Sequence, residues 1–232
     1  MTNATGAFEV MAATSAAMLG DHHPADLLAQ LMTDCMEPLG AHAAAILVRD
    51  GDDELSLLSA SSHATAEIEM LQTQMSAGPC VDAIESRAVV EAIGVDELVA
   101  RWPEVGAAIR DAGYTSVHAF PMSWHGHVLG GLNIFRTAVD EQTDDTRQIG
   151  QAFADVATLV VVQAANVPAD QVAARVRDAM AARSVVEQAK GVLAYLHGLD
   201  MEGAYDRLLQ RSRLDGLSLT ETALSVVREQ HE

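Results

Sequence analysis

Arg183, Glu187 and Lys190 are the residues whose types and spacing point most clearly to a binding chemistry. They lie in the helix-favouring run 182–194, and steps of three and four residues bring them to one face of a helix. Lys190 is the only lysine among 14 basic residues. This face of the helix therefore presents charge, and the solitary lysine makes a phosphate or base contact one interpretation of it. The alternative is an exposed Lys190 that only pairs with Glu187.

A second face of the same segment is apolar. Its spacing alternates three and four residues, which predicts a helix that packs lengthwise on another helix, and we expect the second helix to belong to a copy of the chain in a homodimer. The residues of this seam are Val172, Ala179, Ala182, Val186, Ala189, Leu193 and Leu196. We expect a long helix over 170–197 that Gly198 ends, and two shorter helices over 201–213 and 218–227.

The last 65 residues or so resemble a known family. The matching residues are the run Arg183-Ser184-Val185-Val186-Glu187-Gln188-Ala189-Lys190-Gly191-Val192-Leu193, then His197-Gly198, Ala204-Tyr205, Leu208-Leu209, Ser212, Leu219, Ala223 and Val226-Val227. In this order they are similar to the ANTAR domain. The resemblance implies a three-helix RNA-binding module of transcription antitermination regulators, with two copies matching paired RNA hairpins.

The resemblance turns the charged face of the long helix into a candidate RNA contact. The candidate RNA-binding residues are Lys190, Arg183, Gln188, Arg211 and Arg213. Arg211 and Arg213 can equally belong to a solvated face. Family members commonly carry a basic cluster where this chain has the uncharged run 216–220, so RNA is gripped mainly through the long helix or is bound weakly.

The net charge of −19 is distributed unevenly along the chain. Residues 1–169 hold 6 basic and 23 acidic side chains, whereas residues 170–232 hold 8 and 10. A polyanion therefore meets the least repulsion at the carboxyl-terminal part. Because that part is not basic, binding driven by phosphate attraction alone should be weak and sensitive to salt.

The preceding residues predict an α+β domain. We expect helices over 9–19, 24–39, 64–75 and 102–112, a helix that starts at 78–80 and a long helix that Thr143 caps. We also expect a first hairpin over 44–60, a strand over 88–92 and a second hairpin over 115–135. Pro121 in this hairpin predicts an edge or a bulge. The order of elements, with the runs 78–83, 114–117 and 130–134, is similar to the GAF domain. This gives a GAF-like sensor domain over 1–166, built on an antiparallel sheet, and an all-α three-helix domain over 167–232.

Cys80 and His118 are the candidate ligand-binding residues of the sensor-like part. Cys80 stands at a predicted helix start, where a thiol is either a redox-sensitive group with a lowered pKa or a buried small side chain. His118 lies in a predicted strand and is either a ligand contact or a core histidine. His125 and His127 lack a third nearby ligand, so we expect no metal site. The sequence does not identify a cofactor.

The sequence also excludes several classes of protein. We find no catalytic triad spacing, phosphate-binding glycine loop or paired carboxylates, and we expect no enzyme. The amino terminus has no secretory pattern, and the longest apolar run, 156–162, is far shorter than a membrane span, so we expect a cytoplasmic protein. Two cysteines are too few for a disulfide framework.

Together these features predict a signal-responsive regulator that binds RNA hairpins and acts as a transcription antiterminator. The sensor-like part would receive a small molecule or a partner protein. The alternatives are a signalling scaffold and a small-molecule-binding protein without RNA binding. We expect the break around Asn166-Val167-Pro168 to be short and the helices on either side of it to form a continuous shaft.

Overall fold

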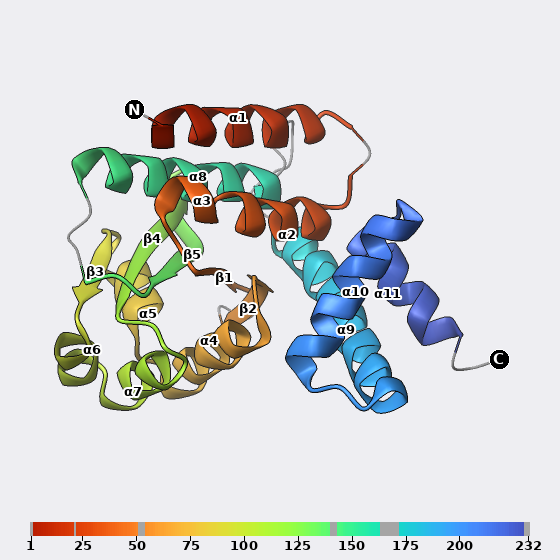
Figure 1. Ribbon diagram of the computed structural model, residues 1–232. Coiled ribbons are helices and arrows are strands. Elements are labelled where there is room, and N and C mark those ends of the chain that lie inside the picture. Colours follow the sequence, from red (N-terminus) through yellow and green to blue (C-terminus); the bar gives the residue numbers. More distant parts are fainter. Residues whose placement is uncertain (1, 21, 51–53, 140–142, 163–171, 230–232) are drawn as a thin grey trace.

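The computed structural model describes residues 2–20, 22–50, 54–139, 143–162 and 172–229. The described part forms an amino-terminal domain around one sheet and a carboxyl-terminal bundle of three helices beside it (Figure 1). The break at residues 166–168 and the domain boundary at 166/167 lie outside the described residues, and so does the centre of the predicted shaft. No helix in the described ranges is both long and apolar enough to cross a membrane.

The sheet of the amino-terminal domain has five strands in the order β2-β1-β5-β4-β3, and every neighbouring pair is antiparallel. The strands are β1 (Ala43–Arg49), β2 (Leu55–Ala60), β3 (Val90–Ile93), β4 (Ser116–Trp124) and β5 (His127–Arg136). Both predicted hairpins are confirmed. The β4–β5 turn has His125 and Gly126 at positive φ, as two-residue hairpin turns require. Pro121 lies past Ala119, where the pairing with β3 ends, which confirms the expected free edge.

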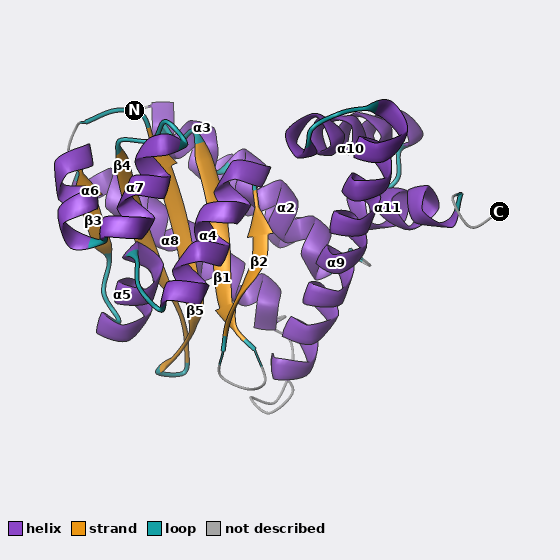
Figure 2. Ribbon diagram, turned by 90° about the horizontal axis from the view of Figure 1, so that it is seen from below, coloured by secondary structure: helices purple, strands orange, loops and turns teal. Residues whose placement is uncertain are grey.

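Helices cover both faces of the sheet (Figure 2). One face carries α1 (Thr2–Ala17), α2 (Pro24–Asp34), α3 (Met36–Leu39) and α8 (Asp144–Val162); the other carries α4 (His63–Met75), α5 (Pro79–Ser86), α6 (Val95–Arg101) and α7 (Pro103–Asp111). As expected, Thr143 caps α8, because its hydroxyl accepts from the Thr146 amide at 3.2 Å. Helix α6 was not predicted. Its seven residues end at Arg101, only one residue before α7 begins at Pro103, and so short a segment gives too little periodicity to separate it from α7.

The core divides at the sheet because side chains alternate along each strand. Phe120, Met122 and Ile134 point toward α8 and α2, whereas Val117, Ala119 and Phe135 point toward α6 and α7. Helix α8 approaches closely at Gly150, where a Cβ atom would lie 2.2 Å from the ring of Phe120. The two buried layers therefore hold different sets of side chains.

The carboxyl-terminal bundle consists of α9 (Val172–His197), α10 (Met201–Asp215) and α11 (Leu219–Arg228). The three helices follow the prediction closely. Gly198 and Gly216 take positive φ in the two turns, and Ser218 begins α11 with a capping box to Glu221. Ala189 and Leu193 of α9 pack on Ala204, Leu208, Ala223 and Val226 of the other two helices. This small core orients α9.

We expect Gly130→Ala to destabilise the protein by about 2–3 kcal/mol, because an added Cβ would lie 2.1 Å from the Leu47 carbonyl oxygen, and backbone of a paired strand cannot move aside locally. Urea unfolding measures the change. Gly191→Ala on α9 is the control: its Cβ would meet no atom within 4 Å, and alanine favours helix, so this variant should be unchanged or more stable. Equal stability of both variants would contradict the packing of β1 on β5.

Candidate nucleic-acid interface

Lys190, the centre of the predicted RNA face, is buried in this structure, with 3% of its surface exposed. Its Nζ atom donates to both carboxylate oxygens of Glu187, at 3.0 and 2.9 Å. It also lies 3.5 Å from Nδ1 of His63 on α4 and 5.4 Å from the centre of the Tyr205 ring on α10. The pairing with Glu187 agrees with the alternative interpretation of Lys190, but the exposed setting of that alternative is wrong. The ammonium sits between the bundle and the amino-terminal domain.

Two carboxylates, one from each domain, connect the domains. Each accepts hydrogen bonds from the first turn of a helix in the other domain. Glu202 at the start of α10 accepts from the backbone amide of His63 at the start of α4, at 3.1 Å. Asp26 of α2 accepts from the Thr220 amide at 3.2 Å and from the Thr220 hydroxyl at 2.9 Å, at the start of α11. Amides of a first turn have no partner within their helix, so both contacts satisfy donors that carry partial positive charge.

A cavity of about 50 Å³ lies between the two domains. Its walls combine apolar side chains with the charged groups of α9. The lining residues include Asp26, Leu57, Leu58 and Ser62 of the amino-terminal domain and Arg183, Val186, Glu187, Lys190 and Thr220 of the bundle. The charged face of α9 is therefore turned toward β2, α2 and α4 and away from solvent. Figure 1 shows the bundle on this side of the sheet domain.

Arg183 shares the interface with Lys190. It lines the same cavity and is half-buried, and this burial lowers the pKa of its guanidinium, while the nearby Glu187 acts in the opposite direction. A half-buried arginine favours a multivalent acceptor such as a carboxylate or a phosphate. The two cations predicted from the sequence therefore lie together, next to Glu187.

The other three candidate residues lie apart from this pair. Arg211 of α10 donates from Nη1 to Glu229 at 3.0 Å, also binds Glu229 through Nη2, and contacts Asp215 at 3.4 Å. The hydrogen bonds to Glu229 raise the pKa of the Arg211 guanidinium. Arg213 and Gln188 are exposed. The run 216–220, where family members commonly carry a basic cluster, forms the α10–α11 turn and the first two residues of α11, and its last residue is the Thr220 that binds Asp26.

The apolar seam of α9 packs within one chain. Ala189 and Leu193 belong to the core of the bundle, Ala179 belongs to the core beneath α8, and Ala182 is 7% exposed. Leu196 remains 47% exposed. The seam thus packs on other helices, as predicted, but the helices with which it packs are those of its own chain. A homodimer remains a proposal and does not rest on this seam.

Cys80 and His118 lie on opposite faces of the sheet, so they do not share one site. Cys80 is the second residue of α5 and packs with Ala45, Leu47 and Ile84. Burial, followed by the charge of Glu69, raises the pKa of its thiol, and this favours the buried structural role over a reactive thiolate. His118 is fully buried on the side of α8, with Nε2 3.6 Å from the Glu91 carboxylate. The described residues contain no cluster of three potential metal ligands.

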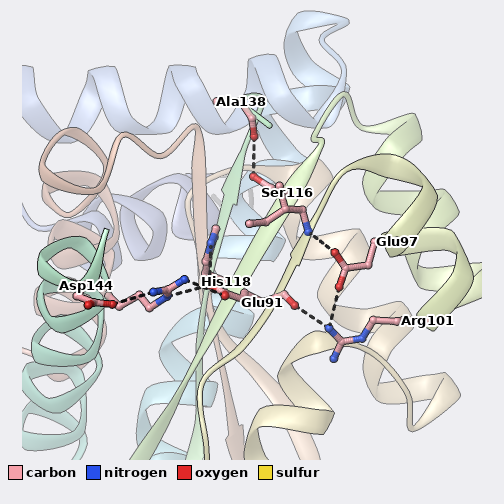
Figure 3. Close-up of polar contacts among 9 residues, drawn as sticks. Glu91, Glu97, Arg101, Ser116, His118, Ala138 and Asp144 are labelled. Carbon is pink, nitrogen blue, oxygen red and sulfur yellow. Dashed lines mark hydrogen bonds and ion pairs between the residues drawn. The ribbon is translucent and has the colours of Figure 1, made fainter. Parts of the chain in front are cut away.

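Glu91 ties the sheet to the start of α8 (Figure 3). Its carboxylate accepts from Nε and Nη2 of Arg147, at 3.1 and 3.0 Å, and Arg147 also binds Asp144 at 3.0 Å. The bonds to Glu91 raise the pKa of Arg147. On the other side of Glu91, its backbone oxygen accepts from Arg101 at 2.6 Å. His118 is therefore next to an ion pair that holds α8 against the sheet edge, which fits a structural role.

A fully buried carboxyl group, Glu69 of α4, was not predicted from the sequence. Its two oxygens accept from Asn133 of β5 at 2.6 Å and from Gln72 at 2.9 Å. Gln72 in turn accepts from the Cys80 amide at 3.0 Å, at the start of α5. Burial raises the pKa of Glu69 to about 8, which the hydrogen bond from Asn133 only partly offsets. The carboxyl is therefore mostly protonated at neutral pH.

The sequence offered no signal for these contacts across the interior. Glu67 and Glu69 stand two residues apart on α4, yet Glu67 is exposed and Glu69 is buried. Asp26 and Glu202 read as ordinary first-turn acids, which favour helix starts. Their partners are 194 and 139 residues away, so local patterns cannot reveal them.

The two domains match two family models. The model described as GAF domain matches residues 21–162, and the model described as ANTAR domain matches residues 174–227. The predicted order of domains is therefore confirmed. A search of the curated proteins finds no match.

Solved structures that resemble the sheet domain include GAF domains. One from a phosphoenolpyruvate-protein phosphotransferase of Coxiella burnetii has a TM-score of 0.54 and 14% identity, over 70% of this chain and 96% of that one. The phycoerythrobilin-bound GAF domain of a cyanobacterial phytochrome has 0.53 and 12%, over 69% and 96%. A GAF domain from an Acinetobacter phosphoenolpyruvate-protein phosphotransferase has 0.51 and 11%, over 69% and 96%. At these identities the likeness shows the fold alone.

We expect Glu69→Gln to stabilise the protein increasingly as pH rises from 5 to 8. The folded-state pKa of about 8 lies above the ordinary 4.5, so the stability from the protonated carboxyl is fully present below pH 4.5 and is lost as pH rises toward 8. The neutral glutamine escapes this loss, which amounts to at most about 1.4 kcal/mol per pH unit. Thermal unfolding at several pH values measures it.

The exposed Glu85→Gln on α5 serves as the control, because it removes one carboxylate without touching the buried cluster. Its unfolding temperature should follow the wild-type pH profile. If Glu69→Gln followed that same profile, Glu69 would be an ordinary ionised carboxylate in the folded protein.

Proposed function

We infer the function from the family to which this chain belongs: it is a GAF domain protein in which an ANTAR domain follows the GAF domain. GAF domains are sensor domains, and ANTAR domains are regulatory RNA-binding domains. We propose that the chain is a cytoplasmic, signal-responsive regulator that binds hairpins of nascent RNA through its ANTAR domain. Binding would keep a terminator from forming and so allow transcription to continue.

The observation that carries this proposal is the position of the only lysine. Lys190 and Arg183 share one face of α9, inside the segment that matches the ANTAR model. Glu187 holds Lys190 as a carboxylate would hold any ammonium, and a phosphate group offers the same acceptor chemistry with more oxygens. The face is therefore suited to a phosphate backbone.

Most of the acid excess lies outside this domain. The GAF domain together with the segment that follows it, residues 1–169, carries 23 acidic and 6 basic side chains and repels a polyanion. RNA that approaches α9 while the domains are in contact meets this acidic surface first. Use of the Lys190 face by RNA thus requires the two domains to move apart.

The second candidate function is that of a signalling scaffold or small-molecule-binding protein without RNA binding. The uncharged run 216–220 and the pairing of Arg211 with Glu229 favour it, because both reduce the positive surface of the bundle. We also keep the homodimer as a proposal. Since its seam is buried within one chain, two copies would pair through another surface or only after the domains separate.

We expect Lys190→Ala to weaken binding of a paired-hairpin RNA about tenfold and to lower the slope of log affinity against log salt by about one, because one phosphate contact is lost. Arg183→Ala should act in the same direction. Fluorescence anisotropy of labelled RNA at several salt concentrations measures both effects on the full chain.

Arg110→Ala is the matched control, since Arg110 is a surface arginine of α7 that pairs with Asp111 in the GAF domain. It should leave affinity and slope unchanged. Equal binding by the wild type and all three variants would overturn the assignment of the RNA face, and no binding by any of them would favour the scaffold function.

A further inference from the structure

The GAF domain covers the face of α9 that is proposed for RNA, and hydrogen bonds between the two domains hold it there. We propose that the GAF domain inhibits the ANTAR domain through a latch, formed by His63, Asp26, Glu202 and Thr220, that must open before Lys190 can bind RNA. This regulation rests on the proposed RNA function. The latch itself is a statement about the two domains and can be tested without RNA.

Lys190 has no donor left for a phosphate while the latch is closed. A lysine ammonium carries three N–H donors. Two of them match the contacts with Glu187 at 3.0 and 2.9 Å, and the third faces Nδ1 of His63 at 3.5 Å. A phosphate oxygen would have to displace one of these acceptors, and the burial of the ammonium leaves it no path. RNA and α4 therefore compete for one group.

The two carboxylates of the latch belong to different domains, and each accepts a hydrogen bond from the other domain. Glu202 reaches from the bundle to the first turn of α4, and Asp26 reaches from the GAF domain to the first turn of α11. Each bond joins a negative charge to the positive end of a helix. Because the two contacts lie on different helices of each domain, together they fix the orientation of the bundle as well as its distance.

The interface also has features that allow the two domains to separate. Beside these polar contacts it contains the cavity of about 50 Å³, so its apolar walls, among them Leu57, Val186 and Leu219, are incompletely packed. Imperfect packing forfeits dispersion contacts, and polar interfaces between domains separate more readily than large apolar ones. A modest change on either side can therefore shift the balance between the closed and open forms.

Helix α4 connects the latch with the interior of the GAF domain. Its first residue, His63, contacts the bundle, and six residues later Glu69 lies in the buried cluster with Asn133 and Gln72. A change in that cluster that tilts or shifts α4 moves His63 directly. The signal thus has a route to the latch that does not depend on residues 163–171.

The only lysine makes the latch measurable. An amine-acylating reagent, sulfosuccinimidyl acetate, modifies just Lys190 and the terminal α-amino group, and mass spectrometry of peptides separates the two. In the wild type we expect slow acylation of Lys190 relative to the α-amino group. The double variant Asp26→Ala/Glu202→Ala should acylate Lys190 about tenfold faster, since two charge-assisted contacts that keep the domains closed are lost.

The double variant Glu37→Ala/Asp206→Ala is the matched control: it removes two exposed carboxylates from the same two domains and changes the net charge equally. It should acylate at the wild-type rate, and circular dichroism should show all three proteins folded. The latch is refuted if the Asp26/Glu202 variant labels no faster than this control, or if Lys190 of the folded wild type labels as fast as an exposed amine.

Measuring RNA binding by the same variants distinguishes the latch from the proposed RNA function. Faster acylation together with tighter binding of the paired-hairpin RNA by the Asp26/Glu202 variant supports both proposals. Faster acylation without any RNA binding keeps the latch and removes the RNA function. Tighter RNA binding without faster acylation contradicts the latch, because the gain then arises from the lost negative charge, and the control variant should show it too.

Discussion

The burial of a single ammonium group is the constraint on which the arrangement of this protein depends. Moving a charge out of water is costly unless the charge is paired, so Lys190 is stable at 3% exposure only because Glu187 and His63 supply acceptors. Glu187 belongs to the same helix and goes wherever Lys190 goes. His63 belongs to the other domain, and its contact exists only while the domains are docked. The ammonium thus links the state of the GAF domain to the exposure of α9.

The GAF domain contributes a second buried ionisable group with the opposite outcome. Glu69 has no cation within its cluster and is surrounded by the amides of Asn133 and Gln72, so burial raises its pKa to about 8 and favours the neutral form. Lys190 is buried next to an anion, and Glu69 is buried without a cation. Both lie along the path from the sheet, through α4, to α9. Helix α4 therefore connects the buried polar cluster of the GAF domain with the surface that covers α9 of the ANTAR domain.

Much of this fold could be predicted from the sequence because its elements are defined locally. The glycines at 198 and 216 separate the three helices of the bundle, and the short polar turns define the two hairpins. Helix α6 was missed, since it is short and runs almost directly into α7. The apolar seam of α9 was read correctly as a packing face, but the pattern of a helix does not state whether its partner belongs to the same chain.

Only part of the candidate site could be predicted, because a local pattern does not identify the partner of a residue. The sequence singled out Lys190 and Arg183, and the structure places them together. It could not show that α4, more than 120 residues earlier, lies over them, because a contact between distant residues leaves no periodic signal. Asp26 and Glu202 stand in the first turns of α2 and α10, where acidic residues are common, and only the fold shows that each contacts the other domain.

Hydrogen–deuterium exchange of the full chain with and without a paired-hairpin RNA tests the central claim most directly. The His63 amide donates to Glu202 only in the docked form, so RNA should make the first turn of α4 exchange faster while α9 around Lys190 exchanges more slowly. Opposite changes in these two segments are the result we predict. Slower exchange in α9 with no change in α4 would mean that RNA binds without releasing the GAF domain, and would contradict the account.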